Sequence, residues 1–211
     1  MPTRPEKGTA VKDNRQNIID ATDRLLRTHG LARLTTREIA REAGVAEGLI
    51  YHHFKDKAEL IFEVIAARMR ETKNYLQNLP LEVGKSTLFG NLENTLFSIY
   101  QAHYEVTPII NTVFADQKLR ARLQEIVKER KMGPRYAMEG LAVYLAAEQR
   151  MGRLSDTVDT DVLAKCLWMI GIQSAMLDRW LGNQYDENHI RREIRDCLKT
   201  MMTGFEPHPR Q

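Results

Sequence analysis

The segment LTTREIAREAGVAEGLIYHHFKDKAEL, residues 34–60, decides the fold of this chain of 211 residues. It holds two short helical patterns separated by Gly44, followed by an aromatic and basic stretch. Thr35 or Thr36 can cap the first helix, and Glu38 completes the Thr-x-x-Glu capping box with Thr35. Gly44 suits a sharp turn, because glycine adopts a positive φ without steric cost. The segment therefore predicts a helix-turn-helix whose second helix can enter the major groove of DNA.

The rest of the chain repeats apolar residues at three- and four-residue spacing, and alternating strand-like runs are missing. We therefore expect an all-α protein. Gly30 should stop the first helix, while Pro108 and Gly133-Pro134 should end or split later ones, because proline removes a backbone donor and crowds the preceding turn. The expected helices cover residues 14–29, 35–43, 46–51, 57–78, 88–107, 108–115, 118–131, 135–151, 161–181 and 187–205.

Composition places few limits on function. The chain is 43% hydrophobic and 28% charged, which is ordinary for a soluble globular protein. No apolar run reaches the roughly 18 residues of a membrane span, and the polar N-terminus lacks a signal-peptide pattern, so we expect a cytoplasmic protein without membrane contact. Cys166 and Cys197 lie in apolar helical patterns and are interpreted as buried small hydrophobes. We expect no disulfide, metal or cofactor.

Between residues 39 and 60, several residue types stand at fixed spacing: Ile39-Ala40, Ala43-Gly44-Val45, Gly48, Ile50-Tyr51, Phe54, Lys57 and Leu60. This pattern resembles the signature of the TetR/AcrR family of transcriptional regulators, over about the first quarter of the chain. The resemblance implies an N-terminal three-helix DNA-binding domain, followed by a C-terminal helical bundle that binds a ligand and forms a homodimer. The helix that begins at Ala46 would be the recognition helix.

The leading residues of that helix should face base edges, while polar side chains around it suit phosphate oxygens. Gly48 would give the backbone a close approach to the DNA. Ala46 departs from the serine or threonine common in the family, so a cap contact is lost. Glu47 is repelled by phosphates unless it accepts a hydrogen bond from cytosine N4 or orients a basic neighbour, so we expect it to read sequence. The expected DNA contacts are Thr36, Arg37, Ala46, Glu47, Gly48, Leu49, Tyr51, His52 and Lys57.

Basic residues must be segregated for DNA to bind, since residues 1–60 hold 11 Lys and Arg against 9 Asp and Glu. The adjacent pair His52-His53 is a poor metal site, because neighbouring helical residues diverge and no third ligand lies at useful spacing. His52 is a candidate for a backbone contact and His53 for packing. The candidates for the DNA-facing basic side are Arg15, Arg37, Arg41, Lys55 and Lys57, with Arg4, Lys7 and Lys12 on an N-terminal arm.

Aromatic residues and methionines in the expected second domain form stripes that are first of all core-forming. Ligand pockets are nevertheless lined by such groups together with a few polar ones. The candidate ligand contacts are Tyr100, His103, Tyr104, Asn111, Phe114, Tyr136, Trp168 and Gln173.

The last two helices carry more apolar surface than one packing contact requires, which indicates a partner surface. The resembling family pairs these helices across a two-fold axis, which suits a palindromic operator. The candidate interface residues are Met176, Leu177, Trp180, Ile190, Ile194, Cys197 and Met201.

The expected organisation is a flexible basic arm over 1–13, a DNA-binding domain over 14–60 and a ligand-binding and dimerisation domain over 61–205, with a tail over 206–211. The helix over 57–78 would link the two domains. We expect a repressor that a small hydrophobic effector releases from double-stranded operator DNA. The alternative is a DNA-binding protein of the same fold that a protein partner controls, or that acts without a ligand. No enzyme is expected, because no di-iron Glu-x-x-His pair, phosphate loop or nucleophile elbow is present.

Overall fold

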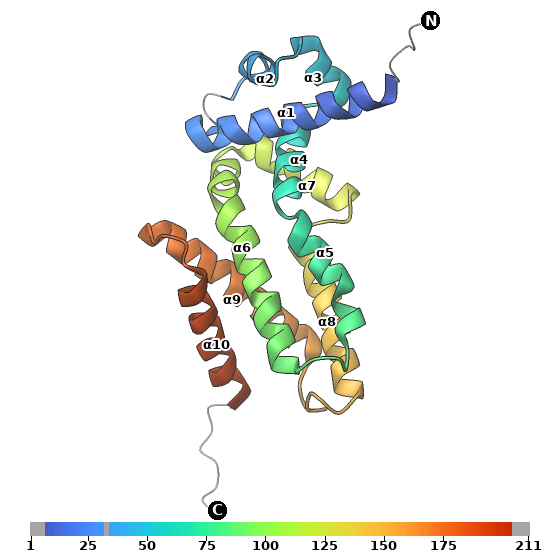
Figure 1. The fold of residues 1–211 in the computed structure, drawn as a ribbon, viewed down its shortest axis with the longest axis vertical. Helices are drawn as coiled ribbons and strands as arrows, with labels where there is room; N and C mark the ends of the chain where they lie inside the picture. The colour runs from blue at the N-terminus through green and yellow to red at the C-terminus, as the bar shows by residue number, and fades with distance from the viewer. Residues whose placement is uncertain (1–6, 32–33, 204–211) are drawn as a thin grey trace, which may run out of the picture. The chain divides into compact units, whose positions relative to one another are not determined.

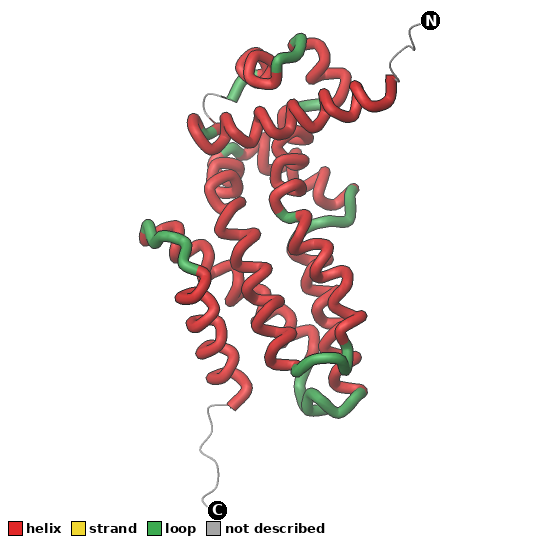
Figure 2. Tube along the Cα trace, viewed as in Figure 1, coloured by secondary structure: helices red, strands yellow, loops and turns green. Residues whose placement is uncertain are grey.

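The computed structural model describes residues 7–31 and 34–203, and within these ranges every regular element is helical (Figures 1 and 2). This confirms the all-α prediction. The first elements are α1 (Lys7–His29), α2 (Thr36–Ala43), α3 (Glu47–His53), α4 (Lys57–Arg68) and α5 (Arg70–Asn78), followed by the 3₁₀ turn η2 (Leu79–Glu82). The others are α6 (Leu88–Ala115), α7 (Gln117–Glu129), α8 (Pro134–Arg150), α9 (Thr160–Leu181) and α10 (Glu187–Thr203).

The chain divides into two compact units, and neither is a single continuous segment. The first unit holds the residues up to Arg68 together with Pro108–Lys131, and the second holds Met69–Thr107 and the residues from Met132 onward. The sequence did not predict that residues 108–131 would join the N-terminal helices. The chain passes from one unit to the other between α4 and α5, within α6, and after α7.

The first unit is built around one apolar core from α1–α4, the end of α6 and α7. Ile18, Ile39 and Ile61 are almost fully buried in it, and Ile109 and Val113 of α6 belong to the same cluster. The start of α2 is capped as expected: the Thr35 side chain accepts a hydrogen bond from the Glu38 N–H at 3.2 Å.

The corner between α2 and α3 depends on a glycine. Gly44 has φ 69° and ψ 31°, the left-handed conformation that favours glycine, and its N–H reaches back to the carbonyls of α2. Val45 N–H also bonds the Ala40 carbonyl at 3.0 Å. The turn therefore ends α2 and redirects the chain into α3 within three residues, 44–46.

The second unit packs α6, α8, α9 and α10 around a separate core that includes Leu96, Tyr144, Leu145 and Leu167. The helices α6 and α9 approach closely at Gly171, where an added Cβ would lie 2.7 Å from Ile99 Cγ2. A side chain at this position would push the two helices apart.

Three predicted boundaries are wrong. First, α1 begins at Lys7, so residues 7–13 of the expected flexible arm are helical; no proline lies between Lys7 and His29. Second, the helix expected over 57–78 is interrupted at Met69, whose φ of −90° and ψ of 2° leave the helical region. Third, the expected helices over 88–107 and 108–115 are one helix, α6, with Pro108 inside it.

Pro108 is tolerated because the carbonyl that loses its backbone donor accepts a hydrogen bond from another donor. That carbonyl belongs to Tyr104, four residues earlier, and it accepts a hydrogen bond from Arg179 Nε at 2.6 Å. The Arg179 guanidinium also lies 3.8 Å from the centroid of the Tyr104 ring. The proline rule fails here because the replacement donor is 75 residues away in sequence.

Candidate nucleic-acid interface

The helix α3 is anchored on one side and exposed on the other. Ile50 is buried in the core of the first unit, while Glu47, Gly48 and His52 are exposed and Leu49 is half-buried. Tyr51 is 61% exposed, a large exposed fraction for an aromatic side chain. The exposed face therefore contains the residues that the sequence predicted to contact DNA.

The starts of α2 and α3 are connected by hydrogen bonds between side chains. The Thr36 hydroxyl donates to Glu47 Oε1 at 2.5 Å and lies 3.4 Å from the Tyr51 hydroxyl. These three residues form one polar cluster on the exposed face. The Glu47 carboxylate therefore already has a donor that holds it in place, so it can present its other oxygen to a base.

Four of the eight predicted basic residues are exposed on α2, on the turn after α3 and at the start of α4. The side chains of Arg37, Arg41, Lys55 and Lys57 are exposed. Partial burial lowers the pKa of Lys57, and the nearby Asp116 carboxylate opposes that shift. Arg4 lies outside the described residues, and the side chains of Lys7 and Lys12 are not described.

The structure places Arg15 differently from the prediction. Its guanidinium pairs with Glu63 at 2.9 Å and lies 5.2 Å from the centroid of the Phe54 ring. Arg15 therefore holds α1 against α4, and the prediction that it faces DNA needs correction because its charge is already paired with a carboxylate.

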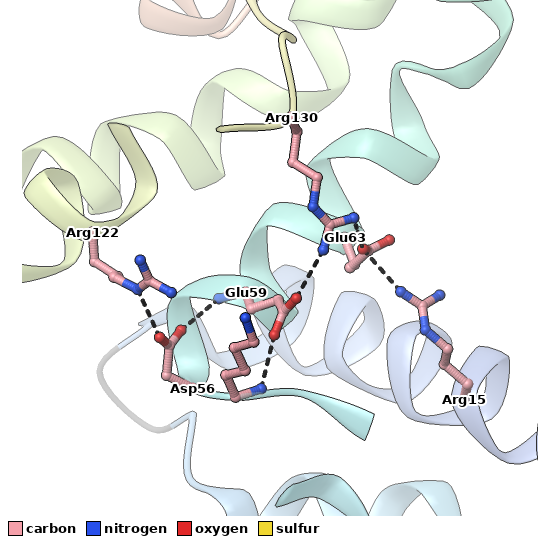
Figure 3. A network of polar contacts seen from close by, with 7 residues as sticks. Arg15, Asp56, Glu59, Glu63, Arg122 and Arg130 are labelled. Atoms are coloured by element: carbon pink, nitrogen blue, oxygen red, sulfur yellow. Dashed lines mark hydrogen bonds and ion pairs between the residues drawn. The ribbon is translucent and has the colours of Figure 1, made fainter. Parts of the chain in front are cut away.

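Behind α3, a network of ion pairs connects α1, α4 and the α7 segment (Figure 3). Arg130 bonds Glu59 at 2.8 Å and Glu63 at 3.3 Å, and Glu59 also accepts a hydrogen bond from the Lys55 N–H at 2.8 Å. Arg122 bonds Asp56 at 2.8 Å. These contacts hold the turn between α3 and α4.

The position of Asp56 shows how this turn is fixed. One of its oxygens accepts the Glu59 N–H at 2.8 Å, which caps α4, while the other takes the Arg122 guanidinium. Burial by itself raises the pKa of Asp56, but the hydrogen bonds from Arg122 and from backbone N–H groups outweigh it and lower the pKa. Sequence reasoning missed this network because its partners are 48–71 residues apart.

The candidate ligand residues do not form one group. Tyr100, His103, Tyr104 and Trp168 are buried in the second unit, whereas Tyr136 and Gln173 are exposed on its surface. Asn111 and Phe114 are exposed and belong to the first unit.

Two of the four buried residues, Tyr100 and Tyr104, use their hydroxyls within the chain. Tyr100 donates to Asp178 at 2.7 Å and Tyr104 donates to the Asn183 carbonyl at 3.0 Å.

His103 and Trp168 are the other two, and they differ from the tyrosines. The two rings meet edge to face with their centroids 5.5 Å apart. Their exposed fractions are 6% and 4%, yet neither His103 Nε2 nor Trp168 Nε1 has a hydrogen-bond partner among the described residues. Burial lowers the pKa of His103 to about 4, so the imidazole is neutral near pH 7.

The candidate dimer residues include both exposed and buried side chains. Met176, Leu177, Trp180 and Cys197 are exposed, and Met201 is half-buried. Ile190 and Ile194 are buried in the core of their own unit, so their assignment to a partner surface is wrong. The period of α10 showed correctly that they share a face, but it could not show which neighbour covers that face. Val162 and Met169, which were not among the predicted interface residues, are exposed on α9.

No described helix is long and apolar enough to cross a membrane. Over residues 7–31 and 34–203, no cluster of three or more His, Cys, Asp or Glu residues could hold a metal ion. Cys166 is half-buried and Cys197 is exposed, so the expectation that Cys197 is a buried hydrophobe is wrong.

A capped helix, a left-handed glycine corner and an exposed second helix on one apolar core define a helix-turn-helix protein of the class that binds DNA. Residues 18–64 match the family model described as bacterial regulatory proteins, tetR family. In this segment the chain is therefore similar to the TetR family, which is a family of transcription regulators and not of enzymes.

Proteins that are similar over most of the chain are also described as transcriptional regulators. The HTH-type transcriptional regulator TtgR of Pseudomonas putida is 26% identical over 177 residues, which cover 81% of each chain. A Mesorhizobium loti structure described as a TetR-family transcriptional regulator has a TM-score of 0.74 at 17% identity, covering 92% of this chain and 96% of that one. FadR of Bacillus subtilis, solved with stearoyl-CoA, has a TM-score of 0.64 at 17% identity and covers 87% and 96%.

Proposed function

We propose that this chain is a homodimeric repressor that binds a palindromic DNA operator and is released by a small, largely apolar effector. The observation that carries the DNA-binding part is the exposed face of α3, where Glu47, Gly48 and Tyr51 lie beside the N-terminal end of α2. In this proposal Glu47 and Gly48 meet base edges, and Tyr51 and Lys57 contact phosphates.

The DNA-binding proposal is tested by selecting duplexes from a random library with the full-length protein, then measuring affinity for the selected duplex by fluorescence anisotropy at several salt concentrations. We expect an inverted repeat with half-sites about one helical turn or more apart. The logarithm of the affinity should fall with the logarithm of salt concentration, by about 0.9 for each phosphate neutralised. Selection of a single half-site, or of no sequence, would contradict the proposal.

The Glu47→Ala substitution should reduce discrimination between DNA sequences more than it reduces overall affinity. The carboxylate is held by Thr36 and can accept a hydrogen bond from cytosine N4, a contact worth about 1–3 kcal/mol of discrimination. We expect the ratio of affinities for selected and scrambled duplexes to fall about tenfold, which corresponds to about 1.4 kcal/mol. Glu42→Ala, on the exposed surface of α2, is the control, and an unchanged ratio in the Glu47 variant would exclude base reading by Glu47.

The effector part of the proposal is supported by the pair His103 and Trp168. A buried polar group without a hydrogen bond costs about 1–3 kcal/mol, so two neighbouring ones need an explanation. A bound effector with one polar group could bond both, because Trp168 donates and a neutral imidazole can donate or accept. The stearoyl-CoA bound to the related FadR supports an effector with a large apolar part.

The course of α6 indicates how ligand binding in the second unit affects the DNA-binding unit. The helix α6 carries His103 in the second unit, and six residues later it contributes Ile109 to the core of the first. In our proposal a ligand at His103 displaces α6, and Ile109 and Val113 transmit the shift to α4 and the Asp56–Arg122 turn behind α3. This revises the expectation that the signal travels through one helix over 57–78, since that helix is interrupted at Met69.

The neutral state of His103 predicts a specific dependence of stability on pH. The folded-state pKa, about 4, lies below the ordinary value of 6.5. Between pH 4 and pH 6.5, His103 is protonated in the unfolded chain and unprotonated in the folded chain. The free energy of unfolding therefore falls as pH drops from 6.5 to 4, by up to about 3 kcal/mol. Above pH 6.5 this residue contributes no pH dependence.

The variant His103→Leu should lack this loss. Urea unfolding of the wild type and the variant at intervals from pH 7.5 to 4 gives the difference in free energy of unfolding. We expect the free energy of unfolding of the wild type to fall relative to that of the variant as pH drops. A difference that stays constant over this range would mean that His103 titrates normally and is accessible to water.

A further inference from the structure

The second unit contains a partly open cavity whose lining includes neither His103 nor Trp168. Its volume is about 310 Å³, and it lies at the N-terminal end of α6, beside the loop between α8 and α9 and the C-terminal end of α10. Its apolar wall includes Leu88, Leu92, Leu163, Leu167 and Leu198. This volume is at the lower end of the range of about 300–1,000 Å³ for small-molecule sites.

The lining of the cavity also includes two methionines and a loop residue. Met201 and Met202 contribute flexible side chains from α10, and Val158 contributes from the loop between α8 and α9. None of the predicted effector residues lines this cavity. Met201, which was predicted to contact a partner chain, lines it instead.

One cation, Arg153, faces the cavity, and a fully buried carboxylate holds it. Arg153 Nε lies 3.2 Å from Glu148 Oε2, and Glu148 is 0% exposed. The guanidinium also donates to the Ser86 carbonyl. An arginine has five N–H donors, and these contacts to described residues occupy at most two of them, so the others can serve a ligand in the cavity.

The Glu148 carboxylate limits the charge of that ligand. An anionic ligand would compete with Glu148 for Arg153, and a buried carboxylate that loses its partner costs several kcal/mol. A cationic ligand would be repelled by Arg153. An uncharged ligand with a hydrogen-bond acceptor keeps the ion pair intact and uses the remaining N–H donors.

We propose that this cavity is a second small-molecule site, which binds an uncharged, compact hydrocarbon ligand carrying a carbonyl group that accepts a hydrogen bond from Arg153. The apolar wall takes the hydrocarbon part and Arg153 fixes the carbonyl end. The proposal concerns binding alone, and it stands or falls independently of DNA binding and of the effector site at His103.

The test uses three probes of similar shape: acetylcyclohexane, which has a carbonyl; isopropylcyclohexane, which has none; and cyclohexanecarboxylate, which is charged. The full-length protein is labelled with ¹³C at its methionine methyl groups and titrated without DNA. The Met201 and Met202 signals, assigned from leucine substitutions, should shift with acetylcyclohexane, while the Met169 signal should not. Isopropylcyclohexane and cyclohexanecarboxylate should each bind about tenfold more weakly, the size of one hydrogen bond to a charged group.

Two variants locate the site. Val158→Trp should fill the cavity and remove the shifts, whereas Val143→Trp, at an exposed apolar position on α8 outside the cavity, should bind like the wild type. Arg153→Lys keeps a charge for Glu148 but reduces the N–H donors from five to three, so its preference for acetylcyclohexane over isopropylcyclohexane should be smaller than that of the wild type. Thermal unfolding of each variant checks that it folds.

Three results would overturn the proposal. The first is that no probe shifts Met201 or Met202 in the folded wild type. The second is that Val158→Trp binds as well as Val143→Trp. The third is that the carboxylate binds as tightly as the ketone, which would show that Glu148 does not exclude anions.

Discussion

Replacing Gly48 with alanine should stabilise the protein and at the same time weaken its binding to DNA. Gly48 lies in the first turn of α3, has no positive φ, and an added Cβ would have no heavy atom of the chain within 4 Å. Glycine in a helix costs about 0.5–1 kcal/mol relative to alanine, so the folded chain gains nothing from it. The remaining reason for a glycine on this exposed face is the close approach of something outside the chain.

In the proposed complex that neighbour is the floor of the DNA major groove. An added methyl group would separate α3 from the base edges, and we expect the affinity for the selected duplex to fall at least about tenfold, or about 1.4 kcal/mol. The free energy of unfolding should rise by up to about 1 kcal/mol, since the position lies in the first helical turn. Anisotropy titrations should show weaker DNA binding, and urea unfolding should show a higher free energy of unfolding.

Gly140→Ala is a matched control for this substitution. Gly140 lies inside α8, and a Cβ there also has no heavy atom within 4 Å. This variant should gain similar stability and keep its full affinity for DNA. If Gly48→Ala binds DNA as well as Gly140→Ala does, the α3 backbone does not approach the bases closely, and the recognition face has to be assigned elsewhere.

The sequence predicts local features of this fold well because they depend on neighbouring residues. The Thr35 cap, the Gly44 corner and the break at Gly133-Pro134 follow from backbone preferences of the residues themselves. The exposure of Glu47, Gly48 and Tyr51 follows from the period of α3 once Ile50 is placed in the core. These are the features that define the candidate DNA interface.

The errors occur where a distant residue decides the outcome. Pro108 does not end a helix, because Arg179 supplies the missing donor to Tyr104. The charge of Arg15 is not available to DNA as predicted, because Glu63 pairs with it. Burial of Ile190 and Ile194 is likewise set by packing within the second unit. No spacing rule within one segment contains this information, which is why the ion-pair network behind α3 and the cavity at Arg153 were both missed.

Replacing Trp180 with glutamate should convert the proposed dimer to a monomer. Trp180 is 81% exposed, and Met169, Met176 and Leu177 lie exposed on the same helix, α9. An exposed group of large apolar side chains indicates an interaction surface, and buried tryptophans at interfaces typically contribute at least about 2 kcal/mol. The dimer dissociation constant should therefore rise at least about 30-fold, as measured by analytical ultracentrifugation.

DNA binding distinguishes loss of the dimer from loss of the fold. A monomeric variant with an intact first unit should keep the weak affinity of the wild type for a single half-site, but it should lose the additional affinity for the inverted repeat, because the second half-site is no longer bound by a linked partner. Val143→Glu, which places the same charge at an exposed apolar position on α8, should remain dimeric and bind both duplexes normally. A Trp180→Glu variant that stays dimeric would show that the dimer interface does not lie on this face of α9. A different pair of helices would then have to set the spacing of the two recognition helices on the palindromic operator.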